Sequence, residues 1–294
     1  MSYRDLLPPL WRETVRAYLR DDAPTFDVGG FVVGAAPREA RLLCKQPGRT
    51  VLCGAPFVEA VFEELGCAVE WQPGFADEGA EIVNDAAGAP TCVAVVRGPA
   101  NRLLLGERTA LNILARASGV ATAARELSSL ARAAGWHGEV AGTRKVTPGF
   151  RLVEKYALLV GGCSTHRMDL SAMVMLKDNH VWSTGSITEA VRRARGACGF
   201  SSKIEVEARG LDEALEAARA GADIVMLDNY ASAPALIADA EKLKAAFPAV
   251  LVEASGGVTR ATLPGFFSPH VDVVSLGALT SGYSVADFSL KVAH

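Results

Sequence analysis

The sequence predicts an α/β protein made of an N-terminal α/β sandwich and an incomplete, TIM-like α/β barrel. Short apolar runs recur through the second half of the chain, helical patterns separate them, and most runs end at charged or glycine-rich residues. Apolar runs rich in β-branched residues are typical of buried parallel strands. Polar residues at successive strand ends are typical of barrels, which carry their chemistry there. The runs cover residues 140–142, 173–176, 204–206, 224–227, 250–254 and 271–276.

Helical segments between these runs supply the crossovers that parallel strands require. The expected helices cover residues 187–199, 211–220 and 234–247, with a short one at 259–263. Their expected N-caps are Ser186, Asp212 and Thr259. Repeats of this number fit an incomplete barrel or a doubly wound sheet. We favour the barrel because polar residues follow every strand, whereas a doubly wound sheet concentrates them at one switch point.

The first third of the chain has a different pattern. Helix-like stretches at residues 9–20 and 57–65 alternate with strand-like runs at 68–71 and 91–96. This order predicts a small antiparallel sheet with helices on one side. A long helix is expected next, over residues 101–134.

Two glycines and the tail complete the expected organisation. Gly119 predicts a break or a close helix contact inside the long helix, and Gly135 predicts its end. The tail over residues 279–294 is expected to form a last short helix on the N-terminal layer. The expected domains are 1–115 joined by 280–294, and a barrel over 116–279 that carries the active site.

Composition and charge exclude several classes of partner. The chain has 294 residues, a formal net charge of −3 and a pI near 6.0, which argue against nucleic acid or an acidic membrane as a partner. No apolar stretch approaches the ~20 residues needed to span a bilayer. The six cysteines form no C-x-x-C pair, and no signal peptide leads the chain. We therefore expect a cytoplasmic protein with reduced thiols.

Four cationic side chains lie at or near the expected strand ends: Arg144, Lys145, Arg167 and Lys177. Arginine binds planar carboxylates and phosphates through two parallel hydrogen bonds, and lysine adds a point charge. Together they predict an anion-binding pocket at the mouth of the barrel. A barrel lysine could instead act as a Schiff-base nucleophile, or lie on the surface without a role.

Two carboxylates, Glu207 and Asp228, end successive expected strands. Such a pair can bind Mg²⁺, often through water, with a substrate phosphate completing the coordination. The alternative is a structural pairing with the nearby lysine and arginine side chains. Glu205 and Glu253 precede their strand ends and are expected to point inward as salt-bridge partners.

Glycine turns end the last two expected strands. Ser255-Gly256-Gly257 precedes the short helix expected at 259–263, and Gly277 ends the next run. Free backbone N–H groups and a helix dipole would favour a phosphate there.

Two histidines stand beside charged residues. His166 precedes Arg167 and is expected to contact substrate, whereas His180 is expected either to bind substrate or to cap residues 177–179. Cys163 near His166 raises a Cys–His nucleophile as a weaker hypothesis, since no recognisable motif surrounds the cysteine.

Several motifs occur together and in order, and jointly they resemble the quinolinate phosphoribosyltransferase family, most closely its eukaryotic form. They are Gly106 to Asn112, Ala141 to Lys145, Thr147 to Arg151, Glu154 to Ala157, His166-Arg167, Lys177 to His180, Glu205 to Glu207, Leu227 to Asn229 and Glu253 to Gly257. The resemblance covers essentially the whole chain. Small departures are Val146 after Thr-Arg-Lys and Met168 after His-Arg, and neither removes a charge.

The resemblance implies transfer of the phosphoribosyl group of phosphoribosyl pyrophosphate (PRPP) to quinolinate with decarboxylation, in NAD biosynthesis. The implied quinolinate contacts are Arg144, Lys145, His166, Arg167 and Arg108 of a neighbouring subunit. The positions implied around PRPP and Mg²⁺ are Lys177, Glu207, Asp228, Ser255, Gly256, Gly257 and Gly277. Lys145, Lys177, Glu207 and Asp228 are the residues expected to carry the chemistry. The implied assembly is a dimer or a hexamer of dimers.

Three other functions remain open from the sequence: an aldolase with Lys177 as nucleophile, a phosphoribosyltransferase for nicotinate or another pyridine, and an inactive oligomeric scaffold. Cationic residues sufficient for two ring carboxylates favour the diacid quinolinate. The intact set of charged residues disfavours the scaffold.

Overall fold

The computed structural model describes residues 2–85, 88–282 and 285–293. The chain divides into two compact units. Unit 1 contains residues 1–125, 147–162 and 282–294, and unit 2 contains residues 126–146 and 163–281.

Unit 1 contains a four-stranded antiparallel sheet in the order β12-β1-β5-β3. Its strands are β1 (Pro37–Cys44), β3 (Ala68–Trp71), β5 (Thr91–Pro99) and β12 (Phe288–Val292). A smaller antiparallel pair joins β2 (Gly48–Val51) to β4 (Glu81–Asn84). The antiparallel sheet expected in the first third of the chain is therefore present.

The helices of unit 1 pack through apolar and aromatic side chains. They are η1 (Tyr3–Leu6), α1 (Trp11–Asp22), α2 (Val28–Val33), α3 (Ala55–Glu64), α5 (Arg151–Gly161) and residues 100–125 of α4 (Ala100–Ala133). The ring of Phe57 in α3 meets Trp11 of α1 edge-on at 5.2 Å and Tyr156 of α5 at 5.6 Å. These edge-to-face contacts are favourable because of the ring quadrupoles, and they join three helices in one core.

The long helix α4 is continuous, so the break predicted as one reading of Gly119 is wrong. Gly119 is buried, and its neighbour Ser118 donates its hydroxyl to the carbonyl of Cys53 at 3.2 Å. A glycine inside a helix costs about 1 kcal/mol relative to alanine, which close packing of this segment offsets. Gly135 follows the helix with φ +62°, as expected for a C-terminal glycine.

The C-terminal tail contains a strand, so the short helix predicted over 279–294 is wrong. In β12, Phe288 and Leu290 are buried while Ser289 and Lys291 are not, and this period of two belongs to a strand. Leu290 pairs with Leu42 of β1 in the antiparallel register. Residues 283, 284 and 294 of the predicted helix lie outside the described residues.

Unit 2 is built on a six-stranded parallel sheet in the order β6-β11-β10-β9-β8-β7. The strands are β6 (Glu139–Ala141), β7 (Val174–Leu176), β8 (Ile204–Ala208), β9 (Ile224–Asp228), β10 (Leu251–Ser255) and β11 (Val273–Ser275). Strands β7 to β11 lie in chain order, and β6 follows β11. This cyclic order, open between β6 and β7, is that of an incomplete barrel and not that of a doubly wound sheet, in which the order reverses.

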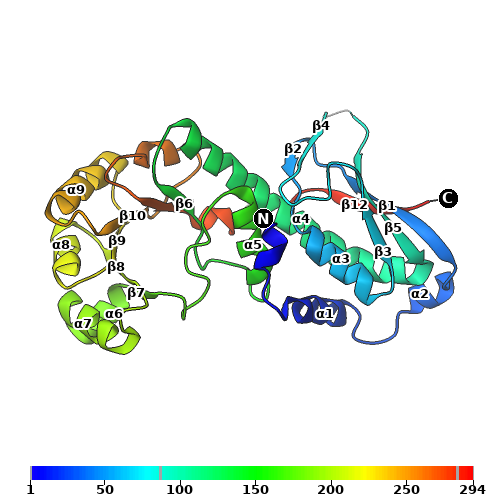
Figure 1. The fold of residues 1–294 in the computed structure, drawn as a ribbon, viewed down its shortest axis with the longest axis horizontal. Coiled ribbons are helices and arrows are strands. Elements are labelled where there is room, and N and C mark those ends of the chain that lie inside the picture. Colours follow the sequence, from blue (N-terminus) through cyan, green and yellow to red (C-terminus); the bar gives the residue numbers. More distant parts are fainter. Residues whose placement is uncertain (1, 86–87, 283–284, 294) are drawn as a thin grey trace. The chain divides into compact units, whose positions relative to one another are not determined.

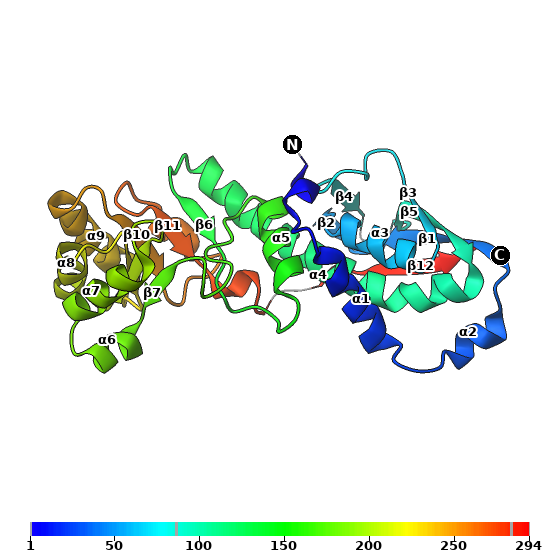
Figure 2. The ribbon, with the colours of Figure 1, turned by 60° about the horizontal axis from the view of Figure 1, so that its bottom comes forward.

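Helices cover the outer side of this sheet (Figures 1 and 2). They are α6 (Asp178–Thr184), α7 (Ile187–Cys198), α8 (Leu211–Arg219) and α9 (Ala233–Ala246). Two 3₁₀ turns, η2 (Leu263–Phe266) and η3 (Gly277–Leu279), follow β10 and β11. Ser186 caps α7 as predicted, because its hydroxyl accepts the N–H of Glu189. The N-cap of α8 is Gly210, so the prediction of Asp212 as a cap is wrong, and Asp212 lies in the first turn.

The helix predicted at 259–263 is also wrong. The N–H of Leu263 donates to the carbonyl of Thr259 at 2.8 Å, which closes one α-type turn, and Thr259 Oγ1 accepts the N–H of Thr262 at 3.2 Å, as an N-cap does. Pro264 has no N–H with which to continue that ladder. The chain therefore passes into the 3₁₀ turn η2.

Among the described residues, no helix has both the length and the apolar character required to cross a bilayer.

Candidate active site

A pocket of about 620 Å³ opens at the carboxyl ends of the parallel strands of unit 2. Ten of the twelve residues predicted to bind substrate line it: Arg144, Lys145, His166, Arg167, Lys177, Asp228, Ser255, Gly256, Gly257 and Gly277. Of the other two, Glu207 contacts the pocket residue Lys177, and Arg108 belongs to unit 1. The pocket arises because parallel strands align their carboxyl ends at one edge of the sheet.

The pocket concentrates positive charge in a chain whose net charge is −3. Arg144 and Lys145 follow β6, Arg167 precedes β7, and Lys177 follows β7. Burial lowers the pKa of Arg167, and the neighbouring positive charge of Arg144 lowers it further. Arginine still keeps its proton in proteins, so the side chain remains cationic.

The backbone around Lys145 holds this side chain in the pocket. The N–H of Lys145 donates to Thr143 Oγ1 at 3.0 Å, and its carbonyl accepts the hydroxyl of Thr280 at 2.7 Å. A Cβ atom added at Gly277 would lie 2.9 Å from Cδ of Lys145. The glycine therefore leaves the space along which the lysine stem lies.

Lys177 begins α6 and forms an ion pair with Glu207 of β8, with Nζ and Oε2 2.6 Å apart. Its backbone N–H donates to His180 Nδ1 at 3.1 Å, so His180 has the capping role that was one of its two predicted roles. Schiff-base lysines lie in apolar pockets or beside other cations. The half-exposed, carboxylate-paired Lys177 does not have that environment.

The turn after β10 requires glycine. Gly256 has φ +94°, and an added Cβ would lie 2.5 Å from the backbone N of Asn229. Asn229 itself has φ +57° and donates its N–H to the carbonyl of Ser255 at 3.3 Å. Because the described residues directly after Gly257 do not form an α-helix, any anion here would meet backbone N–H groups without the helix dipole that was predicted to assist them.

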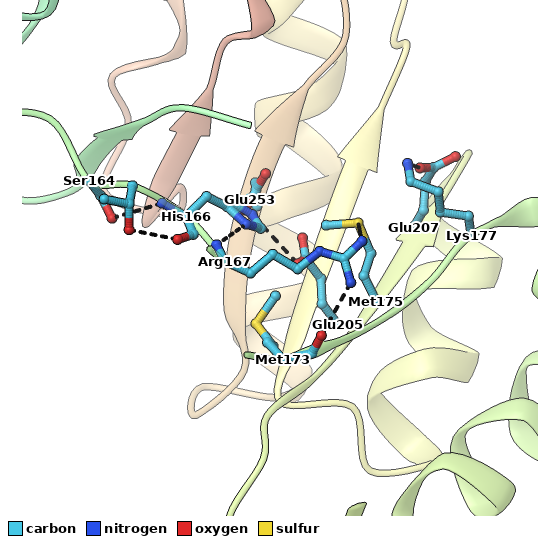
Figure 3. A network of polar contacts seen from close by, with 10 residues as sticks. Ser164, His166, Arg167, Met173, Met175, Lys177, Glu205, Glu207 and Glu253 are labelled. Carbon is cyan, nitrogen blue, oxygen red and sulfur yellow. Dashed lines mark hydrogen bonds and ion pairs between the residues drawn. The ribbon is translucent and has the colours of Figure 1, made fainter. Parts of the chain in front are cut away.

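His166 and the buried side chains of Glu205 and Glu253 form a cluster beside Arg167 (Figure 3). His166 Nε2 is 3.0 Å from Glu253 Oε2 and 3.6 Å from Glu205 Oε2. Burial, followed by the adjacent charge of Glu253, raises the pKa of Glu205 to about 9. Carboxylate oxygens of Glu205 and Glu253 lie within 4.8 Å of each other. Two buried carboxyl groups at this separation do not both ionise, so Glu205 holds a proton at neutral pH. The inward orientation predicted for both glutamates is confirmed.

Ser275 is a pocket residue that sequence reasoning missed. It ends β11, is 3% exposed, and its hydroxyl is among the buried polar atoms for which the structure records no hydrogen-bond partner. Its register partner Ala141 ends β6. The sequence signal was weak, because Ser275 lies inside a run that reads as apolar.

Cys163 does not form the nucleophilic pair considered with His166. Burial raises the pKa of the Cys163 thiol to about 12, which keeps it protonated at neutral pH. A reactive cysteine needs its thiolate and access to solvent. Cys163 is 4% exposed, so it is a packing residue.

Arg108 is an exposed residue of α4 in unit 1. Leu104 lies one turn before it and is 39% exposed, and further exposed apolar side chains follow α1 and cover α2. They are Phe26, Val28, Phe31 and Val32. Leu104 lines a shallow hollow together with Phe26 and Val33, so Arg108 lies one helical turn from a group of exposed apolar side chains.

Comparisons with known proteins agree with these motifs. The quinolinate phosphoribosyl transferase N-terminal domain matches residues 26–118, and the C-terminal domain of that family matches residues 120–291. Human nicotinate-nucleotide pyrophosphorylase (carboxylating) is 53% identical over 288 residues, which cover 98% of this chain and 93% of the human protein. The Dictyostelium discoideum protein of the same name is 45% identical over 300 residues, or 99% of each chain.

Solved structures show the same fold. The nicotinate-nucleotide pyrophosphorylase from Francisella tularensis superposes with a TM-score of 0.83 at 30% identity, covering 98% of each chain. A crystal structure of a NadC deletion mutant gives a TM-score of 0.85 at 34% identity over 98% of each chain. With both domain models matched in order and more than half of its residues shared with a relative of nearly equal length, this chain belongs to the quinolinate phosphoribosyl transferase family.

Proposed function

We propose that this chain transfers the phosphoribosyl group of PRPP to quinolinate and releases CO₂, yielding nicotinate mononucleotide and pyrophosphate for NAD biosynthesis. The observation that carries the proposal is the pocket of unit 2, in which four cationic side chains meet the carboxylate-bearing ends of parallel strands. Both substrates are polyanions, so a chain of net negative charge needs such a local concentration of cations to bind them.

Quinolinate would bind to the cations nearest β6 and β7. Arg144, Lys145 and Arg167 line one pocket, and guanidinium groups pair with planar carboxylates through two hydrogen bonds. Quinolinate carries two adjacent ring carboxylates, whereas nicotinate carries one. Three cations therefore favour the diacid.

PRPP would bind along the strands that follow. Lys177, Asp228 and the Ser255-Gly256-Gly257 turn line the same pocket, and Gly277 lies at the end of the next strand. The positive φ of Gly256 and Gly257 lets the backbone approach a ligand without side-chain interference. Lysine and backbone N–H groups are common phosphate ligands in barrels.

We also propose that the reaction uses Mg²⁺. Magnesium keeps several waters and is held by one or two carboxylates together with substrate phosphates. Glu207 and Asp228 fit this pattern, since they come from neighbouring strands β8 and β9 and Glu207 also contacts the phosphate candidate Lys177. Bound Mg²⁺ would neutralise charge on the leaving pyrophosphate.

The chemistry requires positioning and charge and no covalent enzyme intermediate. The ring nitrogen of quinolinate attacks the sugar C1, and the C1–oxygen bond breaks with its electrons leaving on pyrophosphate. Glu207 and Asp228 would stabilise the positive charge that develops on the sugar, and Lys177 would stabilise the leaving group. CO₂ then departs from the carbon next to the ring nitrogen, and the electron pair of the broken bond stays on that carbon. The positive charge of the neighbouring nitrogen stabilises this carbanion, which takes up a proton from water.

The assembly is proposed to be a homodimer, or a hexamer of dimers, in which Arg108 reaches the active site of the neighbouring subunit. The exposed apolar residues near Arg108 support this proposal, because a second copy would remove them from water. We further propose a protein without nucleic-acid or membrane partners and with a cytoplasmic location, which its six cysteines support because none of them forms a disulfide.

Turnover with competing pyridines tests the substrate. Purified protein is incubated with PRPP and Mg²⁺ plus either quinolinate or nicotinate, and nicotinate mononucleotide is measured by chromatography. We expect product from quinolinate alone. Product from nicotinate at a comparable rate would contradict the preference for the diacid, because nicotinate lacks the second ring carboxylate.

A further inference from the structure

The turn that carries Arg167 has an unusual backbone. His166 has φ +54°, and it is one of two non-glycine residues with positive φ in the described part of the chain. This left-handed conformation is unfavourable for an L-residue and persists only where its surroundings enforce it. The turn therefore needs an anchor.

The imidazole of His166 supplies that anchor through both of its nitrogens. Nδ1 accepts the backbone N–H of Arg167 at 2.8 Å, so Nδ1 carries the lone pair. The ring proton must then lie on Nε2, which donates to Glu253 Oε2 at 3.0 Å (Figure 3). The contacts assign a single tautomer to His166.

The acceptor lies on a rigid element. Glu253 belongs to β10, which is flanked by β9 and β11, and it is 1% exposed. Glu205 is the second carboxyl group near the ring, but it lies 3.6 Å away from Nε2, beyond a hydrogen bond. Glu253 is therefore the group that holds the histidine.

The result of this chain of contacts is the orientation of Arg167. Its backbone N–H is bound by the ring of His166, and its guanidinium donates to the carbonyl of Met173 at 3.2 Å at the edge of the pocket. If the ring of His166 rotated, the backbone N–H of Arg167 would lose its acceptor and the turn would no longer be held. The guanidinium of Arg167 would then move, because the position of a side chain depends on its own backbone.

We propose that Glu253 is a positioning residue: by accepting the Nε2 proton of His166 it fixes the tautomer and the left-handed turn that present Arg167 to the anionic substrate. The inference rests on the proposed function in that quinolinate is the anion that Arg167 binds. The family resemblance implies no role for Glu253. In this arrangement both nitrogens of His166 are engaged, so the histidine acts through Arg167.

The tautomer of His166 is measured without substrate, by long-range ¹H–¹⁵N spectra of the histidine side chains. The signal is assigned by its loss in His166→Asn. We expect the Nε2–H form in the wild type, in Glu253→Gln, whose amide oxygen still accepts the proton, and in Glu205→Gln. We expect that form to be lost in Glu253→Leu. A wild type without the Nε2–H form, or loss of that form in Glu205→Gln, would overturn the assignment.

Kinetics test the consequence. Glu253→Leu should raise the KM for quinolinate about tenfold, the effect of one lost oriented hydrogen bond, and leave the KM for PRPP unchanged. Glu253→Gln should recover most of that loss. Equal increases in both KM values, or a Gln variant as impaired as Leu, would contradict positioning through hydrogen-bond acceptance.

Folding and function are separated in this design. Melting curves accompany every variant, and Glu253→Ser replaces Glu253→Leu if leucine is not tolerated at the buried site. If the chain proves to act on another anion, the tautomer result is unaffected and the proposed function alone fails. If quinolinate turns over normally but the tautomer is absent, only this inference fails.

Discussion

At the scale of single residues, the pocket depends on space as much as on charge. Lys145 reaches the pocket along the face of Gly277, where a methyl group would lie 2.9 Å from the lysine Cδ. Gly256 likewise lets the turn after β10 pack on the backbone of Asn229. Sequence motifs predicted both glycines as phosphate-binding positions. The motifs could not show which neighbouring atoms occupy the space that a side chain larger than that of glycine would fill.

Gly277→Ala should displace Lys145 and spare the fold, since the atom it meets belongs to a flexible side chain. We expect the KM for quinolinate to rise about tenfold, as for one weakened ionic contact, with a melting temperature close to that of the wild type. The matched control is Gly196→Ala on α7, where an added Cβ has open space. It should keep full activity and gain up to about 1 kcal/mol of stability. An unchanged KM for quinolinate in Gly277→Ala would contradict the placement of Lys145 by this glycine.

Glu205 makes the stability of the protein depend on pH. Its pKa is raised from 4.5 to about 9, chiefly by burial. Its contribution to stability is fully present below pH 4.5 and is lost as the pH rises toward 9, because the unfolded chain releases the proton first. Melting temperatures should therefore fall more steeply between pH 5 and 9 in the wild type than in Glu205→Gln. Glu241→Gln, at an exposed position of α9, should follow the wild type. Parallel curves for Glu205→Gln and the wild type would contradict a buried, protonated Glu205.

At the scale of elements, the parallel strands were predictable and the chain after β10 was not. Apolar runs such as Ile224 to Leu227 can only be buried, so their strands followed from composition and length. The segment after Gly257 closes one α-type turn, from the N–H of Leu263 to the carbonyl of Thr259, but Pro264 has no N–H to continue it. Such local effects decide short segments and leave little trace in hydrophobic periodicity.

The C-terminal tail was also mispredicted, and its strand β12 can be tested by mutation. Leu290 is buried against β1, whereas its neighbour Lys291 is exposed. Leu290→Ala should cost about 2–5 kcal/mol in the free energy of unfolding, measured with urea, by loss of buried apolar surface. Lys291→Ala should stay within about 0.5 kcal/mol. Similar costs for the two variants would contradict the alternating burial of a strand.

At the scale of the whole molecule, a chain of net charge −3 places four of its lysine and arginine side chains around one pocket at the carboxyl ends of a parallel sheet. Its strands bring together residues from Arg144 to Gly277, and their order along the chain predicted this because parallel strands end at one edge. The anchoring of His166 by Glu253 was not predictable, since it depends on whether the imidazole lies 3.0 Å or 3.6 Å from a carboxylate of a distant strand. The pattern of strands in the sequence likewise does not predict the oligomeric state.

Subunit mixing tests the shared site. Arg108→Ala and Lys177→Ala should each lose most activity alone, because each removes a charge that the substrates need. If Arg108 serves the neighbouring subunit, a mixed dimer places both defects in one site and leaves the other site intact, so activity returns on mixing. Subunit exchange is verified with differently tagged chains. No recovery despite exchange would place Arg108 in the site of its own subunit.

The reaction itself is tested most directly with quinolinate labelled at either ring carboxyl group. Protein, PRPP and Mg²⁺ are incubated with each labelled substrate, and labelled CO₂ and nicotinate mononucleotide are quantified. We expect the carboxyl group next to the ring nitrogen to appear as CO₂ in a one-to-one ratio with the nucleotide, and the other to remain in the nucleotide. Nucleotide formed without CO₂, or no turnover with both substrates bound, would contradict the proposed phosphoribosyl transfer with decarboxylation.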